Sequence, residues 1–358
     1  MFDTTRRRVV QALGVGGAAT LAGCSTGQQP VEADQQTTAS ATPTQQEPAQ
    51  TTVDRIAADP RDVPDPVDWN EPRRHEISLE VTEETAEIEP GVTFDYMTFD
   101  GRVPGPMIRV RRGDTVNLTL SSPDSNSMPH NIDLHAVYGP GGGADATSIN
   151  PGESATIEFR AMYPGVHIYH CAVPNLDQHI SAGMFGAILV EPEEGLPEVD
   201  HEFYFGQHEI YTDKAAGEEG HHAFDFEAMK KEEPSYVVYN GEAYAFTGNG
   251  YGPVEVDKGD RVRIFMSNGG PNLTSSWHAI GNVWTDFYRD GALANEPEHY
   301  VETAPVAPGT VACAEIDTPV PEPIKLVDHA LTRVARKGMM GVIQVNGSPE
   351  PDIFDPDP

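Results

Sequence analysis

The 358-residue sequence has little cysteine, few basic residues and no long apolar run. With 3 cysteines it can form no more than one intramolecular disulfide. Its 23 Lys and Arg face 56 Asp and Glu, and the formal charge of −33 argues against binding to nucleic acid or to an anionic membrane surface. The apolar run near the N-terminus is too short to cross a bilayer as a stable helix.

That N-terminal stretch is typical of an export signal. It reads TRRRVVQALGVGGAATLAGC, with a basic start at Arg6, Arg7 and Arg8 before the apolar run. The paired arginines resemble a twin-arginine signal, and Leu21–Cys24 resembles a lipobox whose cysteine is lipidated after cleavage; an ordinary Sec signal with an incidental cysteine is the alternative. We therefore expect residues 1–24 to direct export and the protein to be lipid-anchored to the outer face of the cell membrane.

The rest of the chain indicates a tether followed by two β domains. Residues 25–68 are expected to be a disordered tether, because this stretch is rich in Gln, Thr, Ala, Pro and Ser. The remainder, roughly 300 residues, has the length of two domains. The 34 Gly and 31 Pro, with short Val/Ile/Thr/Tyr runs between turn residues, favour an all-β fold of two sandwiches. We predict a first domain over 69–195, a second over 196–347 and an acidic tail over 348–358.

Residues 169–186, YHCAVPNLDQHISAGMFG, bring together a thiol, two imidazoles and a thioether. His170 and Cys171 are adjacent, His179 lies eight positions past Cys171, and Met184 five further on. Thiolate and thioether are soft ligands, and imidazole suits copper. Two His, one Cys and a weak axial Met are therefore typical of a blue-copper electron-transfer site.

The two halves of the chain repeat each other. The stretch IRVRRGDTVNL at 108–118 recurs as VEVDKGDRVRI at 254–264, 146 positions later. YHCAV followed by GMFGAILVE in the first half corresponds to VDHAL followed by GMMGVIQVN in the second. We infer that one domain was duplicated. His329 replaces the cysteine in the second copy, so blue copper is expected in the first domain only.

A second histidine group, in MPHNIDLH at 128–135, becomes intelligible from strand geometry. Alternate residues along a strand point to opposite faces. His170 and Cys171 should therefore point opposite ways, so that one peptide bond links two metal environments. By the same count, His130 and His135 lie on opposite faces of the strand, while Asp133 and His135 lie on the same face. Two sets result: His130, Cys171, His179 and Met184 for blue copper, and Asp133, His135 and His170, with His329 as the candidate third imidazole of a catalytic metal.

These motifs resemble those of the copper-containing nitrite reductases, over nearly all of the chain after about residue 70. The matched segments are Pro129–His135, His170–Cys171, His179–Met184 and Asp328–Leu331. A shorter match, Trp277–Gly281, resembles the family segment that carries a second catalytic residue, here His278, and a pocket isoleucine, here Ile280. The loop between Cys171 and His179 is shorter than in many members and is similar to that of a lipoprotein subgroup.

The resemblance implies a fold, a cofactor set and a reaction. It implies two tandem cupredoxin-like Greek-key β-sandwich domains, with one type 1 and one type 2 copper per subunit. Nitrite would be reduced to nitric oxide and water, with Asp133 and His278 as catalytic residues and one electron from a small blue-copper or cytochrome donor. The subunits would form a homotrimer in which His329 reaches the type 2 copper of the neighbouring chain.

Two other functions compete with this one. A laccase-like multicopper oxidase shares the blue-copper loop, but its trinuclear centre needs repeated His-x-His pairs, and none of the 13 histidines forms one. An electron-carrying cupredoxin would need only the first domain. A disulfide between Cys171 and Cys313 would remove the copper site altogether; otherwise Cys313 is expected to be a small buried residue.

The acid surplus also indicates a haloarchaeal-like, salt-loving form, because a Debye length of about 3 Å at molar salt screens the self-repulsion of such a chain. Since long-range steering fails in that salt, we expect the donor to dock on an apolar patch around the edge of His179. The remaining histidines have no partners at ligand spacing, and His221 and His222 lie in a stretch, EEGHHAFDFEAMKKEE, that resembles a solvated charged excursion.

Overall fold

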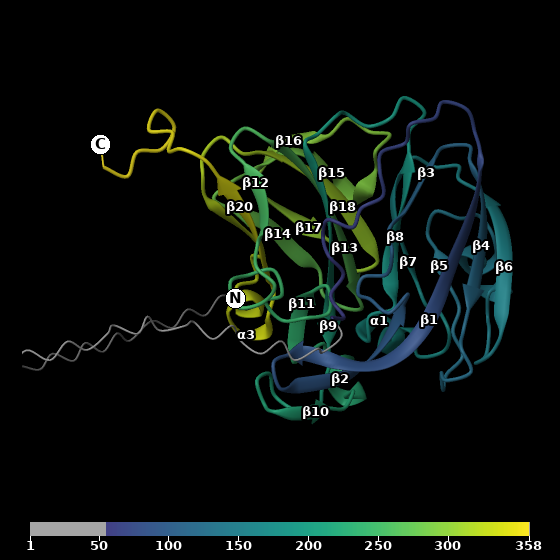
Figure 1. Ribbon diagram of the computed structural model, residues 1–358. Coiled ribbons are helices and arrows are strands. Elements are labelled where there is room, and N and C mark those ends of the chain that lie inside the picture. Colours follow the sequence, from purple (N-terminus) through teal and green to yellow (C-terminus); the bar gives the residue numbers. More distant parts are fainter. Residues whose placement is uncertain (1–54, 358) are drawn as a thin grey trace, which may run out of the picture. The chain divides into compact units, whose positions relative to one another are not determined.

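The structure, a computed structural model, describes residues 55–357 (Figure 1). The signal predicted for residues 1–24 and the larger part of the tether predicted for 25–68 lie outside this range. Strands dominate the described part and form four sheets, as the all-β prediction requires. No helix within it is long and apolar enough to cross a membrane.

Two sheets are built from strands of the first half of the chain, with one short strand of the second half added to the five-stranded sheet. The five-stranded sheet has the order β10-β2-β1-β4-β6 and consists of β1 (Arg74–Glu89), β2 (Val92–Phe99), β4 (Thr115–Ser121), β6 (Ser154–Arg160) and β10 (Gly220–His222). The four-stranded sheet has the order β3-β8-β7-β5 and consists of β3 (Ile108–Arg111), β5 (Asp133–Leu134), β7 (Gly165–His170) and β8 (Phe185–Glu191). The 3-10 helix η1 (Pro140–Ala146) and helix α1 (Leu176–Ser181) lie in the connections.

The other two sheets belong to the second half. One has the order β11-β9-β13-β18-β15-β16 and consists of β9 (His201–Ile210), β11 (Tyr236–Tyr239), β13 (Arg261–Gly270), β15 (Trp284–Tyr288), β16 (Glu298–Val301) and β18 (Thr310–Asp317). The other has the order β12-β20-β19-β14-β17 and consists of β12 (Val254–Asp257), β14 (Ser275–Ile280), β17 (Thr303–Val306), β19 (Pro323–Asp328) and β20 (Met340–Asn346). The connections hold α2 (Phe226–Lys230), η2 (Arg289–Gly291) and α3 (Thr332–Lys337).

Apolar alternation explains how the strands pack. In β4, TVNLTLS, the residues Val116, Leu118 and Leu120 are fully buried while the residues between them are partly exposed. This period of two places one face of the strand on the core. The buried face of β4 shares one apolar cluster with Val110 of β3 and Ile188 of β8, which belong to the opposing sheet. The sheets therefore pack face to face as a sandwich.

Strand pairing repeats between the halves, in agreement with the inferred duplication. β3 pairs in parallel with β8, as β12 does with β20. β4 lies between parallel β1 and antiparallel β6, as β13 lies between β9 and β18. β5 and β7 pair antiparallel, as do β14 and β19. The ends of β7 and β19, which carry the predicted ligands, are therefore equivalent positions.

The halves share one core at their junction. The segment between β8 and β9, in which the boundary near residue 195 was predicted, contains no strand. On either side of it, Ile168 and Phe185 of the first half cluster with Phe265 and Cys313 of the second. Cys171 and Cys313 are both buried free thiols, so the disulfide considered as an alternative is wrong.

The last part of the predicted tether is ordered, which corrects the prediction for residues 25–68. Ile56 and Ala57 are only 2% and 3% exposed. Val103 exchanges backbone hydrogen bonds with this segment, and the Ala57 amide donates to Glu242 Oε1 at 3.0 Å. Composition alone could not predict this docking, because the few apolar residues here contact residues from both halves of the chain.

The predicted solvated excursion at 218–233 is also corrected in part. Its strand β10 pairs in parallel with β2 of the first half. The His222 ring is fully buried, with Nδ1 3.1 Å from Thr212 Oγ1 and Nε2 2.6 Å from the Glu218 carbonyl oxygen. His221 stays on the surface, as expected. The sequence pattern missed a strand that is only three residues long and pairs across the domain boundary.

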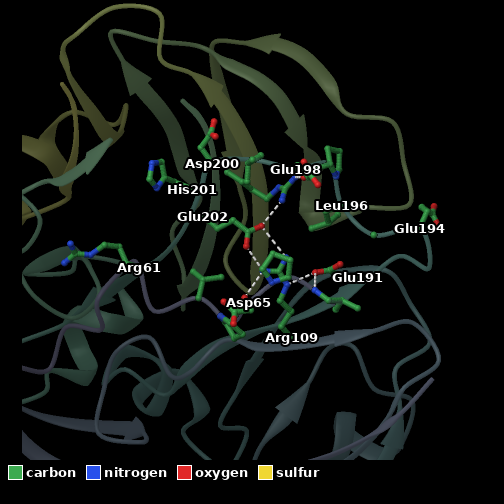
Figure 2. Close-up of a pocket in the computed structure, with 18 residues that line it drawn as sticks. Arg61, Asp65, Arg109, Glu191, Glu194, Leu196, Glu198, Asp200, His201 and Glu202 are labelled. Atoms are coloured by element: carbon green, nitrogen blue, oxygen red, sulfur yellow. Dashed lines mark hydrogen bonds and ion pairs between the residues drawn. The ribbon is translucent and has the colours of Figure 1, made fainter. Parts of the chain in front are cut away.

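Buried ion pairs join the two halves. Arg109 of β3 contacts Glu191 at 2.6 Å and also pairs with Glu202 of β9, and the Arg109 and Glu191 side chains are 1% and 2% exposed. These residues are among those that line a pocket of about 610 Å³ (Figure 2), and no predicted copper ligand lines it. Glu202 also pairs with Arg263 at 2.7 Å. Removing Arg109 would leave the buried Glu191 carboxylate without its arginine, a change that costs about 3–5 kcal/mol of stability.

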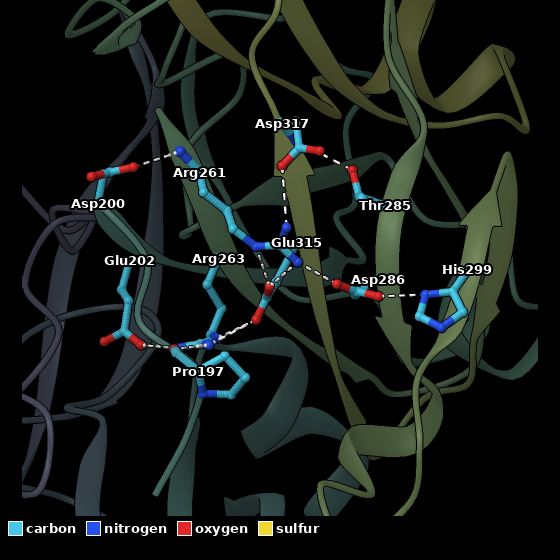
Figure 3. Close-up of polar contacts among 10 residues, drawn as sticks. All are labelled: Pro197, Asp200, Glu202, Arg261, Arg263, Thr285, Asp286, His299, Glu315 and Asp317. Carbon is cyan, nitrogen blue, oxygen red and sulfur yellow. Dashed lines mark hydrogen bonds and ion pairs between the residues drawn. The ribbon is translucent and has the colours of Figure 1, made fainter. Parts of the chain in front are cut away.

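The same network continues into the second half, as Figure 3 shows. Arg263 contacts Glu315 at 2.7 Å, and Glu315 also pairs with Arg261. Arg261 in turn pairs with Asp286, which contacts His299. His299 therefore takes part in a surface ion pair and lies in none of the ligand groups described below, as expected from its lack of partner spacing.

Candidate metal centres

The predicted ligands of the first half lie in two groups on either side of the end of β7. The groups are His130, Cys171 and His179, and Asp133, His135 and His170, and within each the donor atoms lie within 4.8 Å of one another. We refer to them as the Cys171 group and the Asp133 group. In the pairing of β5 with β7, Asp133 lies directly opposite His170. The His170–Cys171 peptide bond connects the two groups.

The Cys171 group is closed and convergent. The Sγ atom of Cys171 lies 3.9 Å from His130 Nδ1 and 3.6 Å from His179 Nδ1, and all three residues are 0% exposed. Asn131 holds the loop beside it, since its Oδ1 accepts the Ala172 amide at 2.6 Å and lies 3.7 Å from Sγ. Both imidazoles thus present the same ring nitrogen to the thiol.

Met184 follows helix α1, which carries His179. Its amide donates to the His179 carbonyl oxygen at 3.0 Å, and its carbonyl oxygen accepts the Cys171 amide at 3.2 Å. Its side chain is fully buried. The backbone therefore returns the thioether residue to the Cys171 group, where a weak fourth ligand was predicted.

Burial governs the protonation of this group. It lowers the pKa of His179 to about 4, with a further contribution from His130, and it lowers the pKa of His130 against the opposing effect of Glu83. Burial also raises the pKa of the Cys171 thiol. Neutral imidazoles keep a lone pair for a metal, and a coordinating thiol is deprotonated by the metal itself. Two imidazoles, a thiol and a thioether residue fit copper.

His179 corrects the expectation about donor docking. It is fully buried, and its Nε2 atom has no hydrogen-bond partner among the described residues. The edge of its ring therefore offers no surface patch. Leu176, on the same short helix, is 45% exposed instead. Residue spacing could not show that the ring would be buried.

The Asp133 group is more open. His135 is exposed, Asp133 partly exposed and His170 buried. His135 Nε2 lies 3.1 Å from His170 Nε2, while His170 Nδ1 lies 3.0 Å from the Cys171 carbonyl oxygen. A carbonyl only accepts, so His170 Nδ1 carries the proton and Nε2 offers its lone pair. Desolvation, and then the neighbouring His170, lower the pKa of His135. Two imidazoles beside a carboxylate fit a metal that keeps open positions.

Gly142 makes room for the Asp133 carboxylate. Its φ is +57°, and a Cβ there would lie 2.0 Å from Asp133 Oδ1 and 2.8 Å from the Leu134 carbonyl oxygen. We expect Gly142→Ala to displace the carboxylate and to lower the nitrite turnover that the resemblance implies by about 10-fold or more, because a misplacement of about 1 Å can cost 100-fold. Copper content should stay unchanged. Gly248→Ala, at a position with nothing within 4 Å, is the control. Equal turnover in the two variants would contradict this role.

The predicted ligand of the second half lies apart from the Asp133 group. His329, which follows β19, is not among the donors gathered there. Its ring instead packs edge-on against His278 of β14, with centroids 5.4 Å apart. Its amide donates to the Ser276 carbonyl oxygen at 2.7 Å, and the buried Asp328 accepts the Ser276 and Ala330 amides. The loop that carries His329 is thus held rigidly.

His278 and Ile280 share this face of β14. His278 Nδ1 lies 2.7 Å from the Glu302 carbonyl oxygen. The other ring nitrogen, Nε2, takes no part in this contact. Ile280 is 37% exposed, two residues along the strand. The predicted catalytic set therefore exists as two parts within one chain, each incomplete by itself.

Sequence reasoning missed three residues beside these groups. Asn131 directly follows His130, and this adjacency could have drawn attention to it. Gly142 lies in a run of three glycines, which by itself does not point to a neighbouring carboxylate. Glu83 contacts His130 Nε2 at 3.0 Å across 47 positions, and nothing local distinguishes it from the other acidic residues.

Comparisons with known proteins show which families the whole chain resembles. A family model described as multicopper oxidase matches residues 80–195. A copper-containing nitrite reductase of Neisseria meningitidis is 42% identical over 303 residues, which are 84% of this chain and 76% of the relative. The solved copper nitrite reductase of Nitrosomonas europaea is 31% identical with a TM-score of 0.70, over 78% of this chain and 96% of that one. A solved multicopper oxidase is 28% identical with a TM-score of 0.66, over 80% and 95% of the two chains.

Proposed function

Because the chain belongs to the family of copper-containing nitrite reductases, we propose that it takes up one electron at the Cys171 group and reduces nitrite at the Asp133 group. Its fold is accordingly that of two tandem cupredoxin-like domains, and it is a copper-dependent oxidoreductase. The observation that carries the proposal is the pair of donor groups connected by the His170–Cys171 peptide bond.

The donor sets fit a type 1 and a type 2 copper per chain. Bound copper would accept and pass on electrons at one site and bind nitrite as a Lewis acid at the other, with the ligands His130, Cys171, His179 and Met184, and His135, His170 and His329. The covalent bond from Cys171 to His170 gives the electron a short route between them. An oxidase centre of the laccase kind is disfavoured, because the sequence has no His-x-His pair.

Asp133 and His278 would supply the protons. Reduction of nitrite to nitric oxide and water consumes one electron and two protons. Asp133 lies opposite His170, where its carboxyl group can donate to a nitrite oxygen beside the imidazoles. His278 has its Nδ1 directed at the Glu302 carbonyl, so its Nε2 can carry and release the second proton. Ile280, on the same strand, would restrict the pocket.

We further propose that the site is completed between subunits of a homotrimer. The Asp133 group and the His278–His329 pair are each incomplete within one chain. A ring of three subunits would bring each Asp133 group against the pair of its neighbour through one repeated interface. Such a ligand would also couple metal binding to assembly, since binding to the assembled state stabilises it.

The proposed setting of the enzyme follows from the sequence. The arginine-rich start and lipobox-like Leu21–Cys24 support export and a lipid anchor on the outer face of the cell membrane. The charge of −33 supports a halophilic host. The donor would be a small blue-copper protein or cytochrome, and Leu176 on α1 offers an exposed apolar contact near the Cys171 group.

Copper content measured together with nitric oxide production tests the function. We expect two coppers per chain and nitric oxide formed from nitrite when a chemical reductant supplies electrons. Cys171→Ala should lose one copper and its blue absorption while keeping the other. Four coppers with oxygen consumption would indicate the oxidase instead, and one copper without nitric oxide would indicate an electron carrier.

A further inference from the structure

Glu83 of β1 contacts the Cys171 group from outside. Its Oε1 atom lies 3.0 Å from His130 Nε2, on the opposite side of the ring from Cys171. The side chain is 18% exposed, and the His130 side chain is 0% exposed. Glu83 therefore lies between the buried His130 ring and the solvent-exposed surface of the sandwich.

The loop before His130 holds this carboxylate in place. The Ser127 amide and hydroxyl donate to Oε2 at 2.9 and 2.6 Å, and the Met128 amide donates to Oε1 at 2.9 Å. Asn126 ties the same loop to β1 by donating to the Val81 carbonyl oxygen at 2.8 Å. Three donors from this loop therefore converge on the two oxygens of Glu83 and hold the carboxylate as an oriented acceptor beside the His130 ring.

An anion at this place determines which nitrogen of His130 carries the proton. A carboxylate can only accept, so Nε2 must carry the hydrogen of the neutral ring. Nδ1 is then left with its lone pair, and it is Nδ1 that faces Cys171 Sγ at 3.9 Å. A carboxylate behind a ligating imidazole also makes that imidazole a stronger donor.

We propose that Glu83 is a positioning residue for the type 1 copper, which holds His130 in its ligating tautomer and lowers the reduction potential of that copper. The inference rests on the proposed function, because it concerns the copper of the Cys171 group. A stronger imidazole donor favours Cu(II) over Cu(I), and the negative charge of Glu83 acts in the same direction. His179, whose Nε2 has no partner among the described residues, lacks such support.

Glu83→Gln tests this in the copper-loaded protein. We expect the midpoint potential of the type 1 copper, followed by its blue absorption during a redox titration, to shift upward. The affinity for that copper, measured against a chelator, should fall about 10-fold or more. Type 2 copper content serves as the check that the variant is folded. Unchanged potential and affinity would overturn the inference.

Two variants separate this role from the effect of charge alone. Glu84→Gln removes the same charge one residue away and should leave the potential near that of the wild type. Glu83→Asp keeps the charge but withdraws it from Nε2, so it should still raise the potential, and it decides the matter if Glu83→Gln does not fold. An equal shift in Glu84→Gln would overturn the inference. A wild type that binds no copper at the Cys171 group would contradict the proposed function itself.

Discussion

Asp133→Asn should retain both coppers and lose nitrite turnover by about 100-fold or more, within the usual contribution of a general acid. The amide of asparagine can still hydrogen-bond to a nitrite oxygen but has no acidic proton to transfer. Asparagine also has nearly the same shape, so the pairing of β5 with β7 and the space left by Gly142 should persist. The loss should therefore fall on turnover far more than on nitrite binding.

The measurement is the rate of nitric oxide formation from nitrite with copper content determined on the same sample. Asp124→Asn makes the same chemical change at an exposed position and should behave as the wild type. A slow Asp133→Asn that had also lost type 2 copper would show a structural effect instead. Full activity with both coppers present would remove Asp133 from the reaction.

Mixing two inactive variants should restore activity if the type 2 site lies between subunits. His135→Ala lacks a ligand of the Asp133 group, and His329→Ala lacks the ligand of the second half. In a mixed trimer an interface gains both histidines whenever the intact Asp133 group of one variant meets the intact His329 of the other. Random 1:1 mixing would restore about a quarter of the sites in a ring with one repeated interface.

The experiment unfolds and refolds the two variants together, or produces them together with two different tags and isolates the mixed oligomers. Each variant refolded alone should remain inactive, and the wild type refolded alone measures the yield. Mixed oligomers without activity, in the presence of a good wild-type yield, would mean that each site is built within one chain. The proposed assembly would then be wrong.

Much of the site could be predicted because its chemistry is local in the sequence. His170 and Cys171 are neighbours on a strand, and strand geometry alone sends their side chains to opposite sides. The spacing of His179 and Met184 brings the chain back to Cys171 through one short helix. The duplication was also readable, because strands with the same neighbours keep the same apolar pattern. The residue types and their division into two groups thus followed from the amino-acid sequence.

Tertiary structure decided what depends on packing between distant segments. The contact of Glu83 with His130 and the space that Gly142 leaves for Asp133 join residues that no periodicity connects. The burial of His179 depends on how α1 lies on the sandwich, and the docking of Ile56 depends on partners from both halves. The separation of His329 from the Asp133 group is likewise a property of the folded chain. Local sequence specifies which face of a strand a side chain occupies, whereas the neighbours across that face are specified only when the sheets pack.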